Sequence, residues 1–306
     1  MAPLRRRHWL ALAGSGLLAA CASSRQRLAV QQGMLPALWQ RRLPKSWAVE
    51  SLDLRQDLPP LGGGIDSLVL SDGWAQALPP QQRRPWPQGP ATQNLLSVAQ
   101  PLLPFGLPLG FGPWLLVLRN RADLLAGDGA ARGWSLLLEP SLRGQLLLPA
   151  SPRVVLEIAR RIGEPQRVLS QLRRQALGFG DRDALTLLLH GDAAAAVLPS
   201  RAVVPMLRRD TRLQALLPES GAPLWWSLLV QPDAGMPPPL EWLLAPRSSP
   251  LLDQMLRSGF TPPLQRALLE PALSRQLRPE LLLPPEPVLQ RCTSLLPLAP
   301  EAAPGG

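Results

Sequence analysis

Few side chains in this chain have the types and spacing that catalysis requires. His190 is the only histidine after residue 8, and the following Gly191 and Asp192 predict a turn. No Gly-x-Ser-x-Gly segment is present to form a nucleophile elbow. Cys292 has no histidine or cysteine companion at the spacing of a metal site. We therefore expect no catalytic residues, no cofactor and no metal, and the remaining polar side chains point to binding.

An acidic and an aromatic side chain follow a predicted strand at 65–70. Asp72 and Trp74 come after this mostly apolar run, and the carboxyl ends of strands hold ligand-binding groups in open α/β sheets. Asp72 could neutralise a cation, or Ser71 and Asp72 could cap a helix at 74–78. Both interpretations stand on the sequence alone.

Serine and arginine side chains follow two further predicted strands. Ser151 and Arg153 come after a strand that ends at position 149, and Ser200 and Arg201 after one that ends at position 198. Guanidinium groups bind carboxylates and phosphates through paired hydrogen bonds. These residues could therefore recognise an anion, or they could lie at the surface in contact with solvent.

Alternating strands and helices predict an α/β protein. Apolar strands are expected at 27–30, 47–50, 65–70, 112–120, 144–149, 191–198 and 224–230. An amphipathic helix is expected at 154–162 with Ser151 as its N-cap, and residues 79–94 lack an apolar period, which predicts an exposed loop. Strands and helices that alternate at this spacing favour parallel sheets.

The N-terminal segment has the pattern of a bacterial lipoprotein signal. Three arginines at 5–7 precede an apolar stretch at 9–20, and the Leu-Ala-Ala-Cys run that ends at Cys21 resembles a lipobox. The stretch is shorter than the ~20 apolar residues that a stable transmembrane helix needs. The arginine pair is also compatible with twin-arginine export.

These features predict where the protein works. We expect residues 1–20 to be a cleaved signal peptide, Cys21 to carry the lipid, and residues 21–27 to form the lipidated tether. Lipid on Cys21 would anchor the mature chain to a membrane surface. The expected location is therefore periplasmic or extracytoplasmic.

The charge of the chain limits its partners. Its 306 residues include 32 basic and 22 acidic side chains, and Lys45 is the single lysine. The arginines are scattered and are not interleaved with aromatic residues, which argues against a nucleic-acid partner. Contact with anionic lipid headgroups is compatible with this charge. Once Cys21 carries lipid, Cys292 has no disulfide partner within the chain.

Several segments occur in a recognisable order. They lie at 107–120, 134–149, 151–154, 190–193, 221–232 and 258–263. The most specific are Trp-x-x-Leu-x-x-Pro-x-x-x-Gly at 134–144 and Gly-Ala-x-x-Trp at 221–225. In order and spacing, over roughly residues 28–290, the chain resembles the bacterial extracellular solute-binding proteins of the spermidine/putrescine type, which are receptors of ABC importers.

The resemblance implies a fold. This is the α/β fold of type II periplasmic binding proteins, in which two α/β lobes enclose a ligand cleft and close on it by a hinge motion. The expected lobe 1 comprises 28–112 and 225–260, and lobe 2 comprises 113–224 and 261–306, with approximate boundaries. A monomer is expected.

The strand-end residues and the segments that match the family together give a set of candidate ligand-binding residues. They are Asp72, Trp74, Ser151, Arg153, Trp225 and Ser227. The family carries a Trp followed two residues later by Asp, and here Trp225 matches but Ser227 occupies the acidic position. Trp225 could be a cleft wall or a core side chain, whereas Trp226 on the opposite face is expected in the core.

Other substitutions argue against spermidine itself as the ligand. Buried ammonium groups need carboxylate partners, but Ser151 and Val154 replace an acidic pair of the family. Pro199 replaces an aromatic residue at a strand end, and the chain has no tyrosine.

Two functions of different classes follow. The first is a substrate-binding lipoprotein of an ABC importer, which binds a small polar or cationic solute such as a polyamine in the cleft and presents it to an ABC permease. The alternative is a degenerate solute-binding scaffold that acts as an interaction or structural lipoprotein of the cell envelope. Neither is an enzyme.

Overall fold

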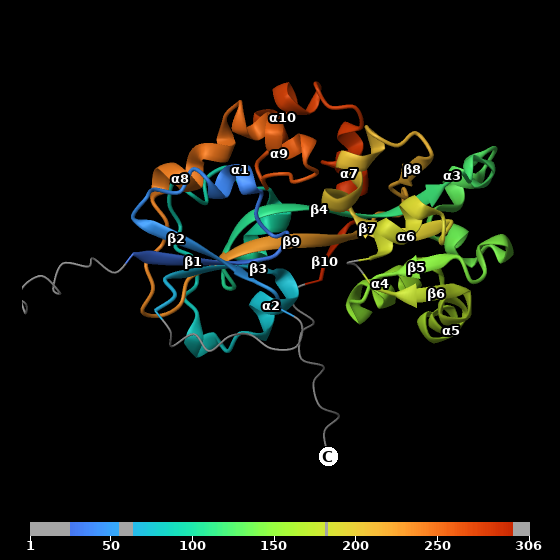
Figure 1. The fold of residues 1–306 in the computed structure, drawn as a ribbon, viewed down its shortest axis with the longest axis horizontal. Coiled ribbons are helices and arrows are strands. Elements are labelled where there is room, and N and C mark those ends of the chain that lie inside the picture. Colours follow the sequence, from blue (N-terminus) through green and yellow to red (C-terminus); the bar gives the residue numbers. More distant parts are fainter. Residues whose placement is uncertain (1–24, 55–63, 181–182, 296–306) are drawn as a thin grey trace, which may run out of the picture.

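A computed structural model describes residues 25–54, 64–180 and 183–295. Within these ranges the strands form one mixed sheet with the order β2-β1-β3-β9-β4-β7-β5-β6 (Figure 1). The strands are β1 (Gln26–Gln31), β2 (Trp47–Leu52), β3 (Ser67–Ser71), β4 (Leu107–Arg119), β5 (Leu146–Leu148), β6 (Ala176–Phe179), β7 (Ala195–Pro199), β8 (Leu213–Leu216), β9 (Pro223–Val230) and β10 (Thr293–Ser294). Outside the main order, β8 pairs with β4 and β10 with β9.

The sheet has two halves joined through its longest strand. Residues 107–113 of β4 pair with β9, whereas residues 114–119 pair with β7 and β8. We call β1, β2, β3 and β9 with the start of β4 the first half-sheet, and β5 to β8 with the end of β4 the second half-sheet. β4 therefore passes from one half-sheet to the other without a break.

Helices cover both half-sheets (Figure 1). They are α1 (Ala37–Gln40), α2 (Asp72–Ala77), α3 (Gly129–Arg132), α4 (Pro152–Ile162), α5 (Pro165–Gln175), α6 (Ala184–His190), α7 (Ser200–Leu207), α8 (Leu240–Leu244), α9 (Leu251–Arg257), α10 (Arg266–Leu273) and α11 (Glu286–Leu289). In Figure 1, α1, α8, α9 and α10 lie above the first half-sheet and α2 lies below it. None of the helices in the described ranges has the length and apolarity that crossing a membrane requires.

The two central strands, β4 and β9, are buried along almost their whole length. Every residue of β9 is buried, and so is every residue of β4 before Arg119. Continuous apolar runs of this kind are typical of strands that lie between two layers of helices. The first half-sheet also packs against a pair of indoles, because the Trp39 and Trp242 rings stack with their centroids 4.9 Å apart.

The predicted parallel pairing is right for the outer strands and for the pair formed by β9 and the short strand β10. β1 runs parallel to β2 and β3, and β5 runs parallel to β6 and β7. The prediction is wrong for the middle of the sheet, where β9 runs antiparallel to β3 and β4, and β4 runs antiparallel to β7 and β8. Strand spacing identifies β-α-β units, but these middle pairs join segments that are far apart in the sequence.

Two local predictions also need correction. Ser151 does occupy the N-cap position of α4, and Ser71 that of α2, but neither side chain makes a capping hydrogen bond. The segment 79–94 is not wholly exposed, because Trp86 is 8% exposed and Thr92 is 3% exposed. Burial of the Trp86 indole outweighs the polar composition of its neighbours.

Candidate ligand-binding site

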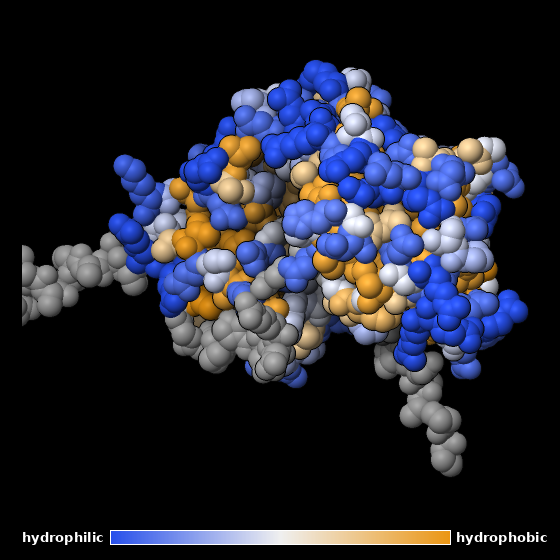
Figure 2. Space-filling view, turned by 45° about the vertical axis from the view of Figure 1, so that its right-hand side comes forward, coloured by the Kyte–Doolittle hydropathy of each residue, from blue (hydrophilic) through white to orange (hydrophobic). Residues whose placement is uncertain are grey.

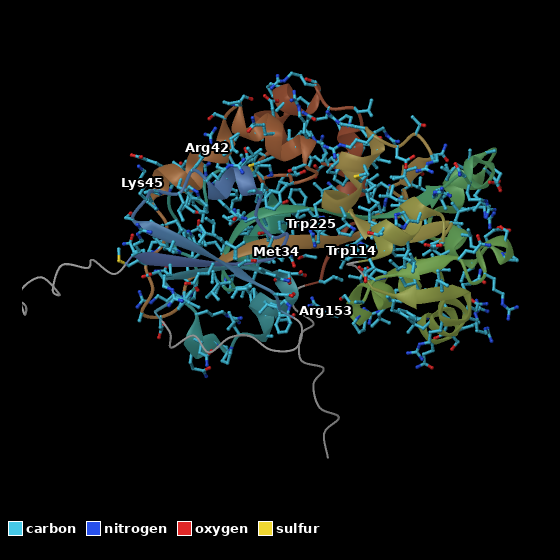
Figure 3. The ribbon with its side chains drawn as sticks, viewed as in Figure 1. Met34, Arg42, Lys45, Trp114, Arg153 and Trp225 are labelled. Atoms are coloured by element: carbon cyan, nitrogen blue, oxygen red, sulfur yellow. The ribbon has the colours of Figure 1, made fainter. Side chains whose placement is uncertain are left out.

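The carboxyl ends of four parallel-type strands converge where the two half-sheets meet. β1 and β3 contribute the first residues after Gln31 and Ser71, and β5 and β7 contribute those after Leu148 and Pro199. We call this region the junction. Among the side chains labelled in Figure 3, Met34, Trp114, Trp225 and Arg153 lie in the middle of the view.

An ion pair crosses the junction from one half-sheet to the other. Nη2 of Arg153, in the first turn of α4, lies 3.8 Å from Oδ2 of Asp72, the first residue of α2. Both side chains are largely buried, with 28% of Arg153 and 13% of Asp72 exposed. The guanidinium group also lies close to Gly73, where a Cβ atom would be 3.4 Å from Nη1.

Burial dominates the titration of Asp72. Loss of solvent raises the pKa of its carboxyl group from 3.8 to about 6, and this effect exceeds the opposing attraction of Arg153. Backbone N–H groups of Gly73 and Trp226 also favour the carboxylate, but they do not reverse the shift. The physical reason is that removing a charge from water costs more than one partner at 3.8 Å returns.

A second contact group surrounds Trp225. Its indole Nε1 donates a hydrogen bond to Oγ of Ser200 at 3.1 Å, and its ring lies 5.6 Å from that of Phe260. The Arg201 guanidinium lies 5.3 Å from the centre of the Trp225 ring, within the range of a cation–π interaction. Trp225 is 3% exposed, so these contacts enclose it almost completely.

Two glycines allow these contacts. A Cβ atom on Gly112 would lie 2.1 Å from Oγ of Ser200, so only glycine leaves room for the Trp225–Ser200 pair. On the other side of the junction, a Cβ atom on Gly33 would lie 3.2 Å from Nη1 of Arg201. Arg201 therefore reaches from the second half-sheet to the loop that follows β1.

The remaining predicted site residues lie within one half-sheet or the other. Ser227 is 0% exposed, and its hydroxyl donates a hydrogen bond to the carbonyl oxygen of Met34. Trp74 is half-buried and packs against the core of the first half-sheet. Ser151 is half-buried at the start of α4. Trp226 is 0% exposed and stacks on Phe111 at 4.9 Å, which confirms the prediction that it lies in the core.

The structure therefore brings Asp72 together with Arg153, and Trp225 together with Ser200 and Arg201. Each of these residues can be named from the sequence, but the sequence does not predict which of them touch. Thr293 and Ser294 are not predicted from the sequence, and they form the two-residue strand β10 beside the start of β9. A strand of two polar residues has no apolar pattern, so no signal in the sequence marks it.

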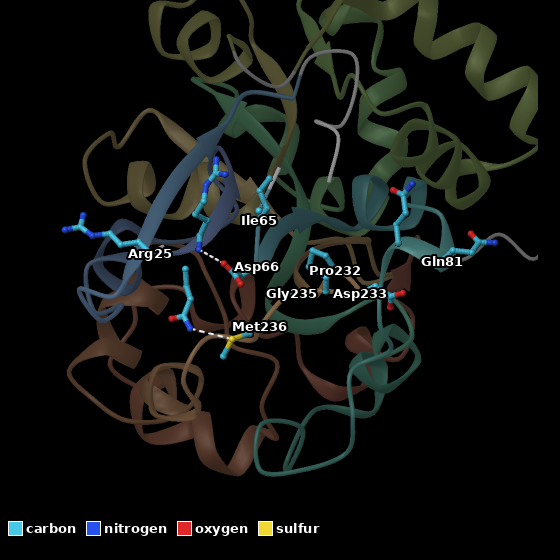
Figure 4. A pocket seen from close by; sticks show the side chains of 13 residues that line it. Arg25, Ile65, Asp66, Gln81, Pro232, Asp233, Gly235 and Met236 are labelled. Carbon is cyan, nitrogen blue, oxygen red and sulfur yellow. Dashed lines mark hydrogen bonds between the residues drawn. The ribbon is translucent and has the colours of Figure 1, made fainter. Parts of the chain in front are cut away.

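A small cavity lies next to Arg153. It has a volume of about 140 Å³ and is lined by residues from α4, β10 and Leu295. A larger groove of about 830 Å³ lies at the opposite edge of the first half-sheet, near the amino ends of β1 and β3 (Figure 4). In that groove the Asp66 carboxylate accepts a hydrogen bond from the backbone N–H of Arg27 at 2.8 Å. Ligand sites of open sheets lie at the carboxyl ends, which favours the junction over the larger groove.

The described part of the chain offers no cluster of side chains that could bind a metal ion. Within residues 25–54, 64–180 and 183–295, no group of three or more His, Cys, Asp or Glu side chains could hold a metal ion. Burial raises the pKa of the Cys292 thiol, which disfavours the reactive thiolate.

The matches between this chain and known proteins are matches of structure and not of sequence. No family model matches the chain, and no curated protein matches it in sequence. A Listeria monocytogenes protein described as a spermidine/putrescine ABC transporter superposes with a TM-score of 0.64 and 14% identity, covering 89% of this chain and 92% of that one. The spermidine/putrescine substrate-binding protein of Streptococcus pneumoniae gives 0.63 and 14%, covering 88% and 92%.

Lipoproteins and receptors for other solutes share the same fold. The PotD-type lipoprotein of Treponema pallidum superposes with a TM-score of 0.57 and 15% identity, over 80% of this chain and 92% of that one. A periplasmic thiamin-binding protein gives 0.53 and 11%, over 80% and 86%. These matches confirm the predicted architecture, and this chain has the α/β fold of type II periplasmic binding proteins.

Proposed function

We propose that this chain is the substrate-binding lipoprotein of an ABC importer and that it binds a small polar solute at the junction. One observation carries the proposal. The fold is that of ABC-transporter substrate-binding proteins over nearly the whole chain, and the carboxyl ends of strands from both half-sheets meet at one place. Charged and aromatic side chains are concentrated there, as ligand recognition requires.

Closure around the solute follows from the way the half-sheets are connected. β4 runs through both of them, and β9 pairs with the part of β4 in the first half-sheet. A hinge at such a crossing lets two rigid bodies rotate together, which is one of the standard closing motions of binding proteins. The Asp72–Arg153 and Arg201–Trp225 contacts join the two sides in the structure described here.

The proposed ligand-binding residues are those named from the sequence. Asp72, Trp225 and Arg153 have the strongest support, because each takes part in a contact across the junction or beside it. A cationic solute such as a polyamine would need Asp72 to leave Arg153, and the aromatic face of Trp225 is already covered by Arg201. These contacts support a polar solute more strongly than they support a polyamine.

The proposed location rests on the N-terminal signal. Cys21 lies outside the described residues, so its lipidation remains a proposal, as do the extracytoplasmic location, the ABC permease partner and the monomeric state. Replacing Cys21 with Ser should abolish incorporation of radiolabelled palmitate and release the protein from washed membranes. A Cys21→Ser variant that still takes up label and stays with the membrane would contradict lipid anchoring at this residue.

Closure can be measured directly. In a Cys292→Ser background, Lys45→Cys and Arg143→Cys place spin labels on exposed positions, one in each half of the protein. Distances between the labels would be measured by pulsed electron resonance with and without amines, amino acids, sugars and organic anions. We expect at least one solute to make the distribution of label-to-label distances narrower and to shift it to shorter distances. A distribution that no solute changes would count against a receptor.

A second function has its own support. Trp225 is 3% exposed and Ser227 is 0% exposed, so two of the proposed ligand-binding side chains are enclosed by the protein itself. Such enclosure is also expected of a scaffold that has lost its ligand and acts as an interaction lipoprotein of the cell envelope. That function gains weight if thermal unfolding is unchanged by every solute of the same panel, since binding to the folded state must raise its stability.

A further inference from the structure

Two residues that line the small cavity beside Arg153 have a buried polar atom without a hydrogen-bond partner in the described part of the chain. Nη2 of Arg153 and Oγ of Ser294 are both buried, and neither has a hydrogen-bond partner among the described residues. Both residues line the cavity of about 140 Å³ between α4 and β10. Because a water molecule occupies about 30 Å³ in the liquid, this space can hold several waters or one small polyatomic group.

The chemistry of these two atoms indicates which kind of group could form hydrogen bonds with both of them. A guanidinium group only donates hydrogen bonds and stays charged, whereas a hydroxyl can donate or accept. The Asp72 carboxylate lies 3.8 Å from Nη2 of Arg153, which is beyond hydrogen-bond distance. A group that satisfies Arg153 and Ser294 together must therefore accept hydrogen bonds, as the oxygens of a carboxylate or phosphate do.

The acidic residue in the cavity wall is already committed to other partners. Glu157 accepts hydrogen bonds from Nη2 of Arg161 at 2.9 Å and from the Thr293 hydroxyl at 2.9 Å. Arg160 also lies 3.8 Å from its carboxylate. A cation entering here would compete with these partners and would approach Arg153 and Arg160, which carry the same sign of charge.

The position of Arg153 connects this cavity to the junction. Its guanidinium lies between the cavity on one side and Asp72 on the other. Arg201 places a second guanidinium at the junction, above the Trp225 ring. Guanidinium groups are suited to planar, paired recognition of oxyanions, more so than ammonium groups.

We infer that the solute of this protein carries an oxyanion group, carboxylate or phosphate, which binds to Arg153 and Ser294 in the cavity between α4 and β10. This inference rests on the proposed receptor function and assigns it an anionic substrate class, opposite in charge to a polyamine. Asp72 holds the Arg153 side chain in place across the junction and does not itself contact the oxyanion group.

The test compares anions with amines on the full chain purified in detergent. Succinate, citrate, inorganic phosphate and glycerol 3-phosphate form the anion arms, and putrescine and spermidine form the amine arm, all in 0.15 M NaCl. Thermal unfolding followed by tryptophan fluorescence detects binding, and titration calorimetry gives the dissociation constant. We expect at least one anion to raise the unfolding temperature, and the carboxylate and phosphate arms show which group is preferred.

Variants identify the residues that bind the anion. Arg153→Gln should raise the dissociation constant about 10- to 100-fold, which is the range that follows from losing a hydrogen bond to a charged group. Arg153→Lys keeps the charge but loses the paired N–H donors of the guanidinium group, so its dissociation constant should lie between those of Arg153→Gln and the parent. Ser294→Ala should raise the dissociation constant several-fold. The control is Arg143→Gln, which removes the same charge from an exposed position of the second half of the protein and should leave binding unchanged.

Each outcome has a distinct meaning. Stabilisation by amines and not by anions overturns the oxyanion assignment while the receptor function stands. Binding of an anion that Arg153→Gln leaves unchanged, with the variant folded by circular dichroism, also overturns the assignment. If no member of this panel stabilises the protein, the oxyanion assignment is contradicted. The wider panel of amines, amino acids, sugars and organic anions used to measure closure then decides whether the receptor function stands.

Discussion

At position 72, burial and ion pairing act in opposite directions on a single carboxyl group. Burial raises the pKa of Asp72 to about 6, although Arg153 lies 3.8 Å away. In the unfolded chain the pKa of this group returns to about 4. The folded protein therefore binds the proton more tightly than the unfolded chain does.

This difference predicts a pH-dependent stability. Because the folded pKa is raised, the stabilisation from protonating Asp72 is fully present below about pH 4 and is lost as the pH rises through about 6. Between pH 7 and pH 4 the parent should gain on the order of 2–3 kcal/mol relative to Asp72→Asn. Urea unfolding of both proteins at several pH values measures this difference.

Asp210→Asn is the matched control for that experiment. Arg212 lowers the pKa of Asp210 to about 2 in the folded protein. In the unfolded chain this pKa is about 4, so from pH 7 down to pH 4.5 the carboxyl group is mainly ionised in both states. The stability difference between the parent and Asp210→Asn should therefore be constant from pH 7 to pH 4.5. A difference for Asp72→Asn that is equally constant would show that Asp72 titrates normally in the folded protein.

The Ser227 hydroxyl gives a second prediction at the residue scale. Ser227 is 0% exposed and donates to the Met34 carbonyl, so Ser227→Ala leaves a buried acceptor without its partner. We expect a loss of about 1–3 kcal/mol in the free energy of unfolding. Ser170 also donates to a backbone carbonyl, but it is exposed, so Ser170→Ala should change stability by less than about 0.5 kcal/mol. Equal effects of the two substitutions would contradict this account.

At the scale of elements, β4 determines how the junction is packed. It pairs with β9 as far as Pro113 and with β7 from Trp114 onward. Close to this change of partner, Gly112 leaves room for the hydrogen bond between Trp225 and Ser200. The strand that connects the half-sheets is thus also the strand that shapes the proposed site.

Gly112→Ala should disturb both roles of β4. The added Cβ atom would lie 2.1 Å from Oγ of Ser200, so Ser200 or Trp225 must move. Overpacking of this kind costs about 1–3 kcal/mol, and the emission of Trp225 should change with its surroundings. Denaturant unfolding and tryptophan fluorescence measure the two effects.

The control for Gly112→Ala is a glycine with free space around it. A Cβ atom on Gly89 meets no heavy atom within 4 Å, so Gly89→Ala should shift stability by less than about 0.5 kcal/mol. If Gly112→Ala were as stable as Gly89→Ala, the packing described around Ser200 would be wrong.

At the scale of the whole molecule, the two half-sheets share one continuous strand and one contiguous set of buried side chains. Loss of β4 from one half-sheet would expose apolar surface of the other. We therefore expect one cooperative thermal transition, with calorimetric and van't Hoff enthalpies that agree. Two separate calorimetric peaks would show that the half-sheets unfold independently.

The sequence determined the elements whose patterns are local. The strand expected at 224–230 is found at Pro223–Val230, and the helix expected at 154–162 is found at Pro152–Ile162. Apolar runs and helical periodicity depend only on near neighbours, so they can be read from the chain itself. The order of segments was also sufficient to predict the type II fold, which the structural matches confirm.

Only the tertiary structure decided how the predicted residues combine. Asp72 and Arg153 lie far apart in the sequence, and their contact depends on how β3 and β5 are placed by strands between them. Likewise, the burial of Ser227 against Met34 depends on the pairing of β9 with β3 and β4. Long-range strand pairing brings such residues together, and it cannot be predicted from composition or from the periodicity of near neighbours.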